Sequence, residues 1–143
     1  MPYKEEDWRT LSIGLETIRE WLALAAKSDA DKKSFYLSQS VHAIWSFGEY
    51  AINVVLELGG DSPEQNHRHS DRAIALAADG RLAKDYSLRL GQLEKYRLKA
   101  THKGYSRGRS VHYSSSDVQN CLDEMCLLQA EVESLLRAKG KLS

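Results

Sequence analysis

Cysteine and proline are scarce in this sequence, and both scarcities limit the possible folds. The only prolines are Pro2 and Pro63. Because proline breaks helices, its near absence leaves long uninterrupted stretches in which helix can form. The only cysteines, Cys121 and Cys126, are five residues apart, a spacing that matches neither a zinc-binding pair nor a redox pair. We therefore predict free, buried thiols, as expected in a reducing cytoplasm.

A long hydrophobic run is also missing, and so is a net charge. No stretch of about 18 apolar residues occurs, so we expect no membrane-spanning helix. Residues 1–7 do not combine a basic region with an apolar one, which argues against a secretory signal and favours a cytoplasmic location. The 20 lysines and arginines are balanced by 20 acids, so only the distribution of charge can indicate a nucleic-acid partner.

The sequence does contain a recurrent three-and-four spacing of apolar residues, which is typical of amphipathic helices. It predicts four long helices and one short helix, at residues 5–27, 33–58, 71–78, 82–101 and 116–139. The second helix has the widest apolar stripe and is expected to be central. Ser70 is predicted to cap the short helix, and Ser116 and Gln119 to form a capping box. We expect one all-α domain over residues 1–143, an antiparallel bundle of four long helices plus one short helix.

A local excess of positive charge lies between Glu94 and Asp117, where six cations and no acid occur. The cations are Lys95, Arg97, Lys99, Lys103, Arg107 and Arg109, and they are interleaved with His102, Tyr105 and His112. Such a segment in a neutral protein is typical of a phosphate-binding surface, so the last four cations are candidate RNA-phosphate ligands. The alternative is a solvated helix end whose cations complement the negative C-terminal dipole.

Arg97 and His102 are the residues of this segment best suited to catalysis. Histidine can accept or donate a proton near neutral pH, whereas arginine stays protonated and can bind phosphate through two donors. On an intact helix, positions five apart lie about 140° apart around the axis and about 7.5 Å apart along it. The two side chains can therefore act on one substrate only if the helix unwinds near His102 or if a second protomer contributes its copies.

The spacing of Arg97 and His102 resembles the Arg-x(4–6)-His motif of the HEPN ribonucleases. The resemblance covers most of the chain: residues 35–58 look like the family's central helix, residues 67–105 like its characteristic stretch, and residues 116–136 like its closing helix. HEPN proteins are typically homodimeric helical bundles whose two Arg–His motifs meet in a cleft. Many are toxins that cleave RNA without a metal and are paired with a minimal nucleotidyltransferase antitoxin. The resemblance thus implies that Arg97 and His102 are catalytic, and no cofactor is expected.

Two positions depart from the family pattern. Active members usually carry a polar residue directly after the arginine, whereas this sequence has Leu98. Some paired toxins are inactivated by modification of a tyrosine two residues after the histidine, and Tyr105 follows His102 by three, which makes Tyr105 a candidate regulatory residue. Three hypotheses follow: a homodimeric endoribonuclease, a non-catalytic HEPN module that binds RNA, a nucleotide or a partner protein, and a purely structural helical dimer.

Other polar and aromatic residues have less specific interpretations. His67 and His69 could supply two metal ligands, but zinc requires three or four, so no metal site is predicted. Ser46 and Glu49 could either orient Arg97 or point to solvent. The tryptophans fall on or beside apolar stripes, so we expect core packing for Trp8, Trp21 and Trp45.

Overall fold

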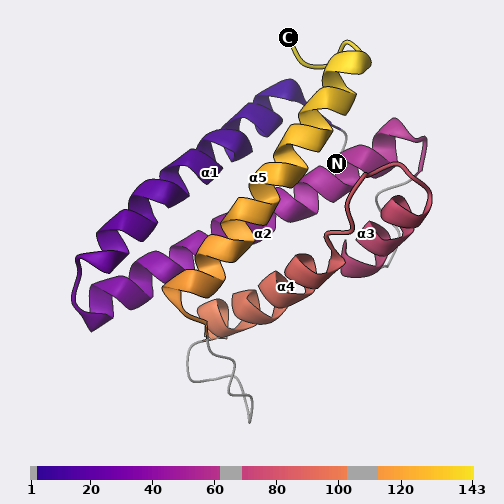
Figure 1. Cartoon of the computed structure of the whole chain (residues 1–143). Helices are drawn as coiled ribbons and strands as arrows, with labels where there is room; N and C mark the ends of the chain where they lie inside the picture. The colour runs from indigo at the N-terminus through magenta and orange to yellow at the C-terminus, as the bar shows by residue number, and fades with distance from the viewer. Residues whose placement is uncertain (1–2, 62–68, 103–112) are drawn as a thin grey trace.

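The computed structural model describes residues 3–61, 69–102 and 113–143, and for residues 69 and 99–102 it describes the backbone alone. The described residues form five α-helices and no strand (Figure 1). The helices are α1 Glu5–Ala26, α2 Ala30–Leu58, α3 His69–Ala78, α4 Ser87–His102 and α5 Ser115–Ala138. The predicted all-α class is therefore confirmed. Within these ranges, no helix combines the length and the apolar character that crossing a membrane requires.

A tight turn joins α1 to α2, and the two helices lie side by side in opposite directions (Figure 1). The Asp29 side chain accepts a 2.9 Å hydrogen bond from the Lys32 backbone N–H and so caps α2. With this cap, α2 begins at Ala30 rather than at residue 33. After the other end of α2, Gly60 adopts a φ of 83°, a left-handed conformation that suits glycine and ends the helix.

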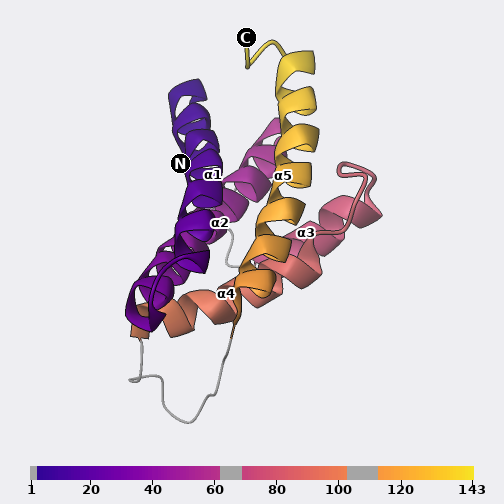
Figure 2. The ribbon, with the colours of Figure 1, turned by 60° about the vertical axis from the view of Figure 1, so that its left-hand side comes forward.

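α2 is the central helix, as the sequence predicted, because it packs against all four other helices. Its side chains Val41, Ile44 and Phe47 are fully buried. The centroid of the Phe47 ring lies 5.2 Å from that of the Trp8 ring of α1. α1 and α5 pack against each other, and α4 is inclined to both of them (Figure 2). The C-terminal part of α4 meets the middle of α2, where Arg97 contacts Trp45.

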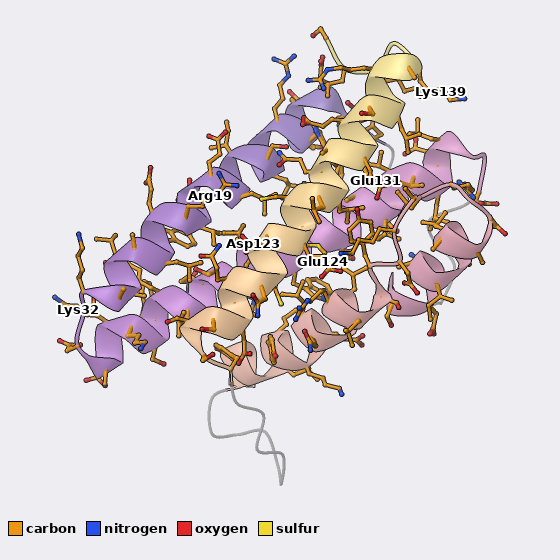
Figure 3. The ribbon with its side chains drawn as sticks, in the orientation of Figure 1. Arg19, Lys32, Asp123, Glu124, Glu131 and Lys139 are labelled. Atoms are coloured by element: carbon orange, nitrogen blue, oxygen red, sulfur yellow. The ribbon has the colours of Figure 1, made fainter. Side chains whose placement is uncertain are left out.

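The start of α4 differs from the prediction. α4 begins at Ser87 rather than at residue 82, because polar groups of the preceding connection bond to α5 instead of continuing a helix. Glu131 of α5 accepts a 2.6 Å hydrogen bond from the Ala83 backbone N–H and a second one from the Tyr86 hydroxyl. Figure 3 shows Glu131 extending from α5 on the side of α3 and α4. The connection is therefore fixed by a carboxylate distant in sequence.

Two helix caps also differ from the prediction. Ser70 lies inside α3, so the prediction that it caps this helix is wrong. The capping box of α5 exists, but it consists of Ser114 and Asp117 instead of Ser116 and Gln119. The Ser114 hydroxyl accepts a 3.2 Å hydrogen bond from the Asp117 N–H, and the Asp117 carboxylate accepts a 2.8 Å bond from the Ser114 N–H. Several consecutive serines made the register of this box ambiguous.

Both cysteines are free thiols of α5, as predicted, but only one of them is fully buried. Burial raises the pKa of the Cys121 thiol to about 11, which keeps it protonated and unreactive near neutral pH. Cys126 is half-buried, and its Sγ accepts a hydrogen bond from Nη2 of Arg19 on α1 at 3.4 Å. The two thiols therefore contribute to helix packing in different ways.

Candidate functional site

Arg97 lies near the C-terminal end of α4 and packs against Trp45 of α2. Its guanidinium carbon Cζ lies 4.1 Å from the centroid of the Trp45 ring. At this distance the positive charge is attracted to the negative face of the indole, a cation–π interaction. Both side chains are half-buried, so the contact is partly shielded from water. Arg97 is therefore a packed residue and does not belong to a fully solvated helix end.

The Nε atom of Arg97 is buried and has no hydrogen-bond partner in the part of the chain that the structure describes. Arg89, about two turns earlier on the same helix, provides a contrast, because its Nε donates a 2.9 Å hydrogen bond to Glu124 of α5. A buried donor without an acceptor is costly, so a purely structural arginine is expected to be paired as Arg89 is. Among the described residues, the Nε donor of Arg97 therefore lacks the acceptor that the Nε donor of Arg89 has.

The register of α4 explains why Arg97 meets α2. Leu90 and Leu93 precede Arg97 by seven and four positions, and both are buried. Residues with these spacings share one face of a helix. Arg97 therefore continues the core-facing stripe of α4, and its charge lies at the edge of that stripe, where it can reach both the Trp45 ring and the surface.

The helical course of α4 bears on how Arg97 and His102 could act together. α4 is helical as far as His102, so the backbone does not unwind before this residue. Positions 97 and 102 stay about 140° apart around the helix axis and about 7.5 Å apart along it. The side chain of His102 lies outside the described residues. The described helix therefore does not bring the two positions onto one face.

The other candidate phosphate ligands follow Arg97 in the sequence. Lys103, Tyr105, Arg107 and Arg109 lie outside the described residues, as does the side chain of Lys99. Their predicted roles in phosphate binding and regulation therefore stay predictions. What the structure does describe is the two chain segments on either side of residues 103–112.

Tyr113 connects the second of these segments to α2. Its hydroxyl oxygen lies 3.2 Å from the Ser38 hydroxyl oxygen, and its ring centroid lies 5.2 Å from that of Tyr96 on α4. Ser38 precedes Trp45 by seven residues, or about 10.5 Å along α2. Tyr113 therefore packs between α2 and α4, next to the residue that precedes Arg97. Tyr113 was not predicted as a site residue, although it directly precedes a strong helix cap.

Ser46 and Glu49 belong to a different feature from Arg97. They line a groove of about 320 Å³ between α1 and α2, together with Leu11, Tyr50, Asn53, Val54 and Glu57. Ser46 is exposed in this groove, and Glu49 is half-buried. The hypothesis that these two residues orient Arg97 is therefore not supported. The residue of α2 that contacts Arg97 is Trp45, for which the sequence predicted only core packing.

The described residues hold no group of three or more histidine, cysteine, aspartate or glutamate side chains that could bind a metal ion. His67 lies outside the described residues, and so does the side chain of His69. The site that the structure describes consists of an arginine and an aromatic ring. Such groups bind anions rather than metal ions.

Comparisons with known proteins give no identification: no family model matches the chain, and no curated protein or solved structure matches it either.

Proposed function

We propose that this protein is a metal-independent endoribonuclease of the HEPN class, in which Arg97 binds the scissile phosphate and His102 transfers protons. The observation that carries the proposal is the state of Arg97. Its guanidinium is held over the Trp45 ring, while its buried Nε has no acceptor among the described residues. An arginine held in place without a carboxylate is suited to a phosphate, whose oxygens match the donors of the guanidinium.

The chemistry fits these two residue types. In the proposed reaction the ribose 2′-hydroxyl loses its proton and attacks the adjacent phosphorus, and the bond from phosphorus to the 5′-oxygen breaks. The products are a 2′,3′-cyclic phosphate and a 5′-hydroxyl, so one proton is removed and one is supplied. An imidazole with a pKa near its ordinary value of about 6.5 can do either. Arginine stabilises the negative charge that builds on the phosphate oxygens.

The proposed active form is a homodimer, because a second copy can place its His102 near Arg97 of the first. The candidate interface is an exposed stripe of α4 that includes the helix position of His102, whereas Arg97 lies outside this stripe, about 180° from Leu88 around the helix. The stripe contains Leu88, which is 68% exposed, and Leu98, which is 38% exposed. Their positions are about 80° apart around the helix axis. Gly91 belongs to the same stripe, and no atom lies within 4 Å of the place that a Cβ atom would occupy there. Exposed apolar residues next to a glycine allow two helices to approach closely.

The HEPN resemblance extends the proposal to a biological role as a toxin component. In that role the partner is a minimal nucleotidyltransferase antitoxin, and Tyr105 is the residue that it would modify. This part depends on the resemblance alone. An aromatic hydroxyl three residues after His102 lies close enough in sequence for an added nucleotide to obstruct RNA binding.

The second candidate function is a non-catalytic module that binds RNA, a nucleotide or a partner protein through the same basic surface. Leu98 is the observation that favours it. This side chain directly follows Arg97 and is partly exposed, at a position where active HEPN members usually carry a polar residue. Without that polar group, Arg97 could still bind phosphate through its cation, whereas the proton transfers would lose a potential hydrogen-bonding partner.

The test is cleavage of a labelled single-stranded RNA in excess chelator by the wild type, Arg97→Ala and His102→Ala. We expect the wild type alone to release fragments with 2′,3′-cyclic phosphate ends, and each variant to lose roughly a hundredfold or more in rate. Lys27→Ala is the matched control, because it removes an exposed cation at the end of α1. Cleavage retained by His102→Ala would exclude His102 from the mechanism. Salt-sensitive binding without cleavage by folded wild type would support the binding module instead.

A further inference from the structure

Trp45 occupies a position on α2 that core packing alone does not explain. Its neighbour Ile44 and nearby Val41 are fully buried, whereas Trp45 is half-buried, with its ring against the guanidinium of Arg97. A ring that served only the core would be expected to be fully buried, as Trp8 is. Part of the Trp45 side chain packs against the core, and the face of its ring contacts the guanidinium of Arg97.

An aromatic face holds an arginine differently from a carboxylate. A carboxylate such as Glu124, which pairs with Arg89 at 2.9 Å, occupies the N–H donors of the guanidinium and neutralises its charge. An indole face attracts the charge from above the guanidinium plane and contains no acceptor for the donors, which lie in that plane. The Trp45 contact can therefore fix the orientation of Arg97 while leaving its hydrogen-bonding capacity for another group.

The Nε of Arg97 is not used by the described part of the chain. It has no acceptor within the described residues, and the charge of Arg97 is not paired there with an acid. From these contacts we infer that Trp45 is a positioning residue, which holds the Arg97 guanidinium so that its donors meet a phosphate oxygen of single-stranded RNA. This inference rests on the proposed function and deepens it, because it adds a residue to the phosphate site.

The experiment is a double-mutant cycle on RNA binding. The probe is a short labelled 2′-O-methyl RNA, which cannot be cleaved through its 2′-oxygen, and the proteins are the wild type, Trp45→Leu, Arg97→Ala and the double variant. We expect each single change to weaken binding roughly tenfold, and Trp45→Leu to cause no further loss when Arg97 is already alanine. Additive losses, or full affinity in Trp45→Leu beside a weakened Arg97→Ala, would overturn the inference while leaving Arg97 as a phosphate ligand.

Two further variants separate positioning from packing. Trp45→Phe retains an aromatic face, so we expect its affinity to stay within about threefold of the wild type. Trp21→Leu removes a half-buried tryptophan of α1, so it is matched for lost packing and should leave the affinity unchanged. A Trp45→Phe variant as weak as Trp45→Leu would show that the cation–π contact is not what holds Arg97.

A measurement without RNA distinguishes failure of this inference from failure of the proposed function. The arginine Nε–H signals are recorded by NMR, and the Arg97 signal is identified by its loss in Arg97→Lys. We expect this signal to be displaced by the ring current of Trp45 and to move toward the signals of exposed arginines in Trp45→Leu. An unmoved signal overturns the positioning role. A signal that moves as expected in a protein that binds no RNA overturns the phosphate ligand and the proposed function with it.

Discussion

The hydroxyl oxygens of Ser38 and Tyr113 lie 3.2 Å apart, although 75 residues separate them in the sequence. The contact joins the start of α5 to α2, and the Tyr96 ring of α4 lies beside it at 5.2 Å from the Tyr113 ring. Three helices therefore meet at the point where residues 103–112 rejoin the described chain.

Removing the Tyr113 hydroxyl should therefore destabilise the fold modestly. We expect Tyr113→Phe to lower the free energy of unfolding by about 1 kcal/mol, since one partly buried hydrogen bond is lost while the ring stays on Tyr96. Ser38→Ala should cost a similar amount, and the double variant little more than either single one. The measurement is urea denaturation of all three. Two fully additive losses would show that the hydroxyl pair is not a real interaction.

The Tyr86–Glu131 contact predicts a loss of stability at alkaline pH. Burial, together with the neighbouring Glu131 carboxylate, raises the pKa of Tyr86 well above its ordinary value of 10.0. Because the folded pKa is higher than the unfolded one, the stabilisation is fully present below about pH 10 and is lost as the pH rises above it. Tyr86 alone can remove up to about 1.4 kcal/mol per pH unit in that range.

This second prediction is checked by denaturation of the wild type and Tyr86→Phe across the alkaline range. Burial also raises the pKa values of Tyr50 and Tyr96, so both proteins should lose some stability. The wild type is expected to lose it more steeply, because only the wild type must ionise a hydroxyl that donates to Glu131. Parallel curves for the two proteins would show that Tyr86 does not contribute.

Gly48 predicts a close-packing constraint at the centre of the bundle. A Cβ atom there would lie 2.7 Å from Cδ2 of Leu90 and 3.2 Å from Sδ of Met125. We expect Gly48→Ala to destabilise the protein by about 1–2 kcal/mol, although alanine favours helix. Gly14→Ala on α1 is the control, because nothing lies within 4 Å of its added Cβ, and it should stabilise by up to about 1 kcal/mol. Thermal unfolding of both variants measures the difference, and equal effects would contradict it.

The exposed stripe of α4 predicts how the proposed dimer can be disrupted. Leu88 is 68% exposed, and a charge there would lie in the proposed interface without a partner. We expect Leu88→Glu to weaken self-association at least tenfold, to lower RNA cleavage in parallel and to leave the helical content unchanged. Ile13→Glu is the matched control on α1, since Ile13 is 60% exposed. Self-association of both variants is measured by sedimentation. If Leu88→Glu associates as strongly as the wild type, the interface lies elsewhere.

Most of the helical framework was predictable from the spacing of apolar residues, because burial of a stripe determines which segments pack. α1 was predicted to within a residue at its end, and the central place of α2 followed from its wide apolar face. The start of α4 was not predictable. Leu82 and Tyr86 fit a helical stripe and are indeed buried, but the Glu131 carboxylate of a distant helix binds the Ala83 backbone N–H and determines a non-helical path.

The candidate site shows a similar division. Arg97 was identified from its spacing to His102 and from the surrounding cations, which are local features of the sequence. Trp45, which contacts Arg97 at 4.1 Å, was not identified as a site residue, because the two residues meet only when α2 and α4 pack. The same holds for Tyr113 and Ser38. Local patterns therefore predict a kind of chemistry, whereas the contacts that Arg97 makes depend on tertiary packing.

The unbroken helix from Ser87 to His102 makes the proposed activity sensitive to the amount of protein in a cell. Under the proposed mechanism, each active centre combines Arg97 of one copy with His102 of another. At concentrations well below the dissociation constant of the dimer, the amount of dimer rises with the square of the total, so halving the abundance lowers cleavage about fourfold. A low concentration of the protein would then be enough to keep cleavage slow, and a modest rise in its synthesis would increase cleavage more than proportionally.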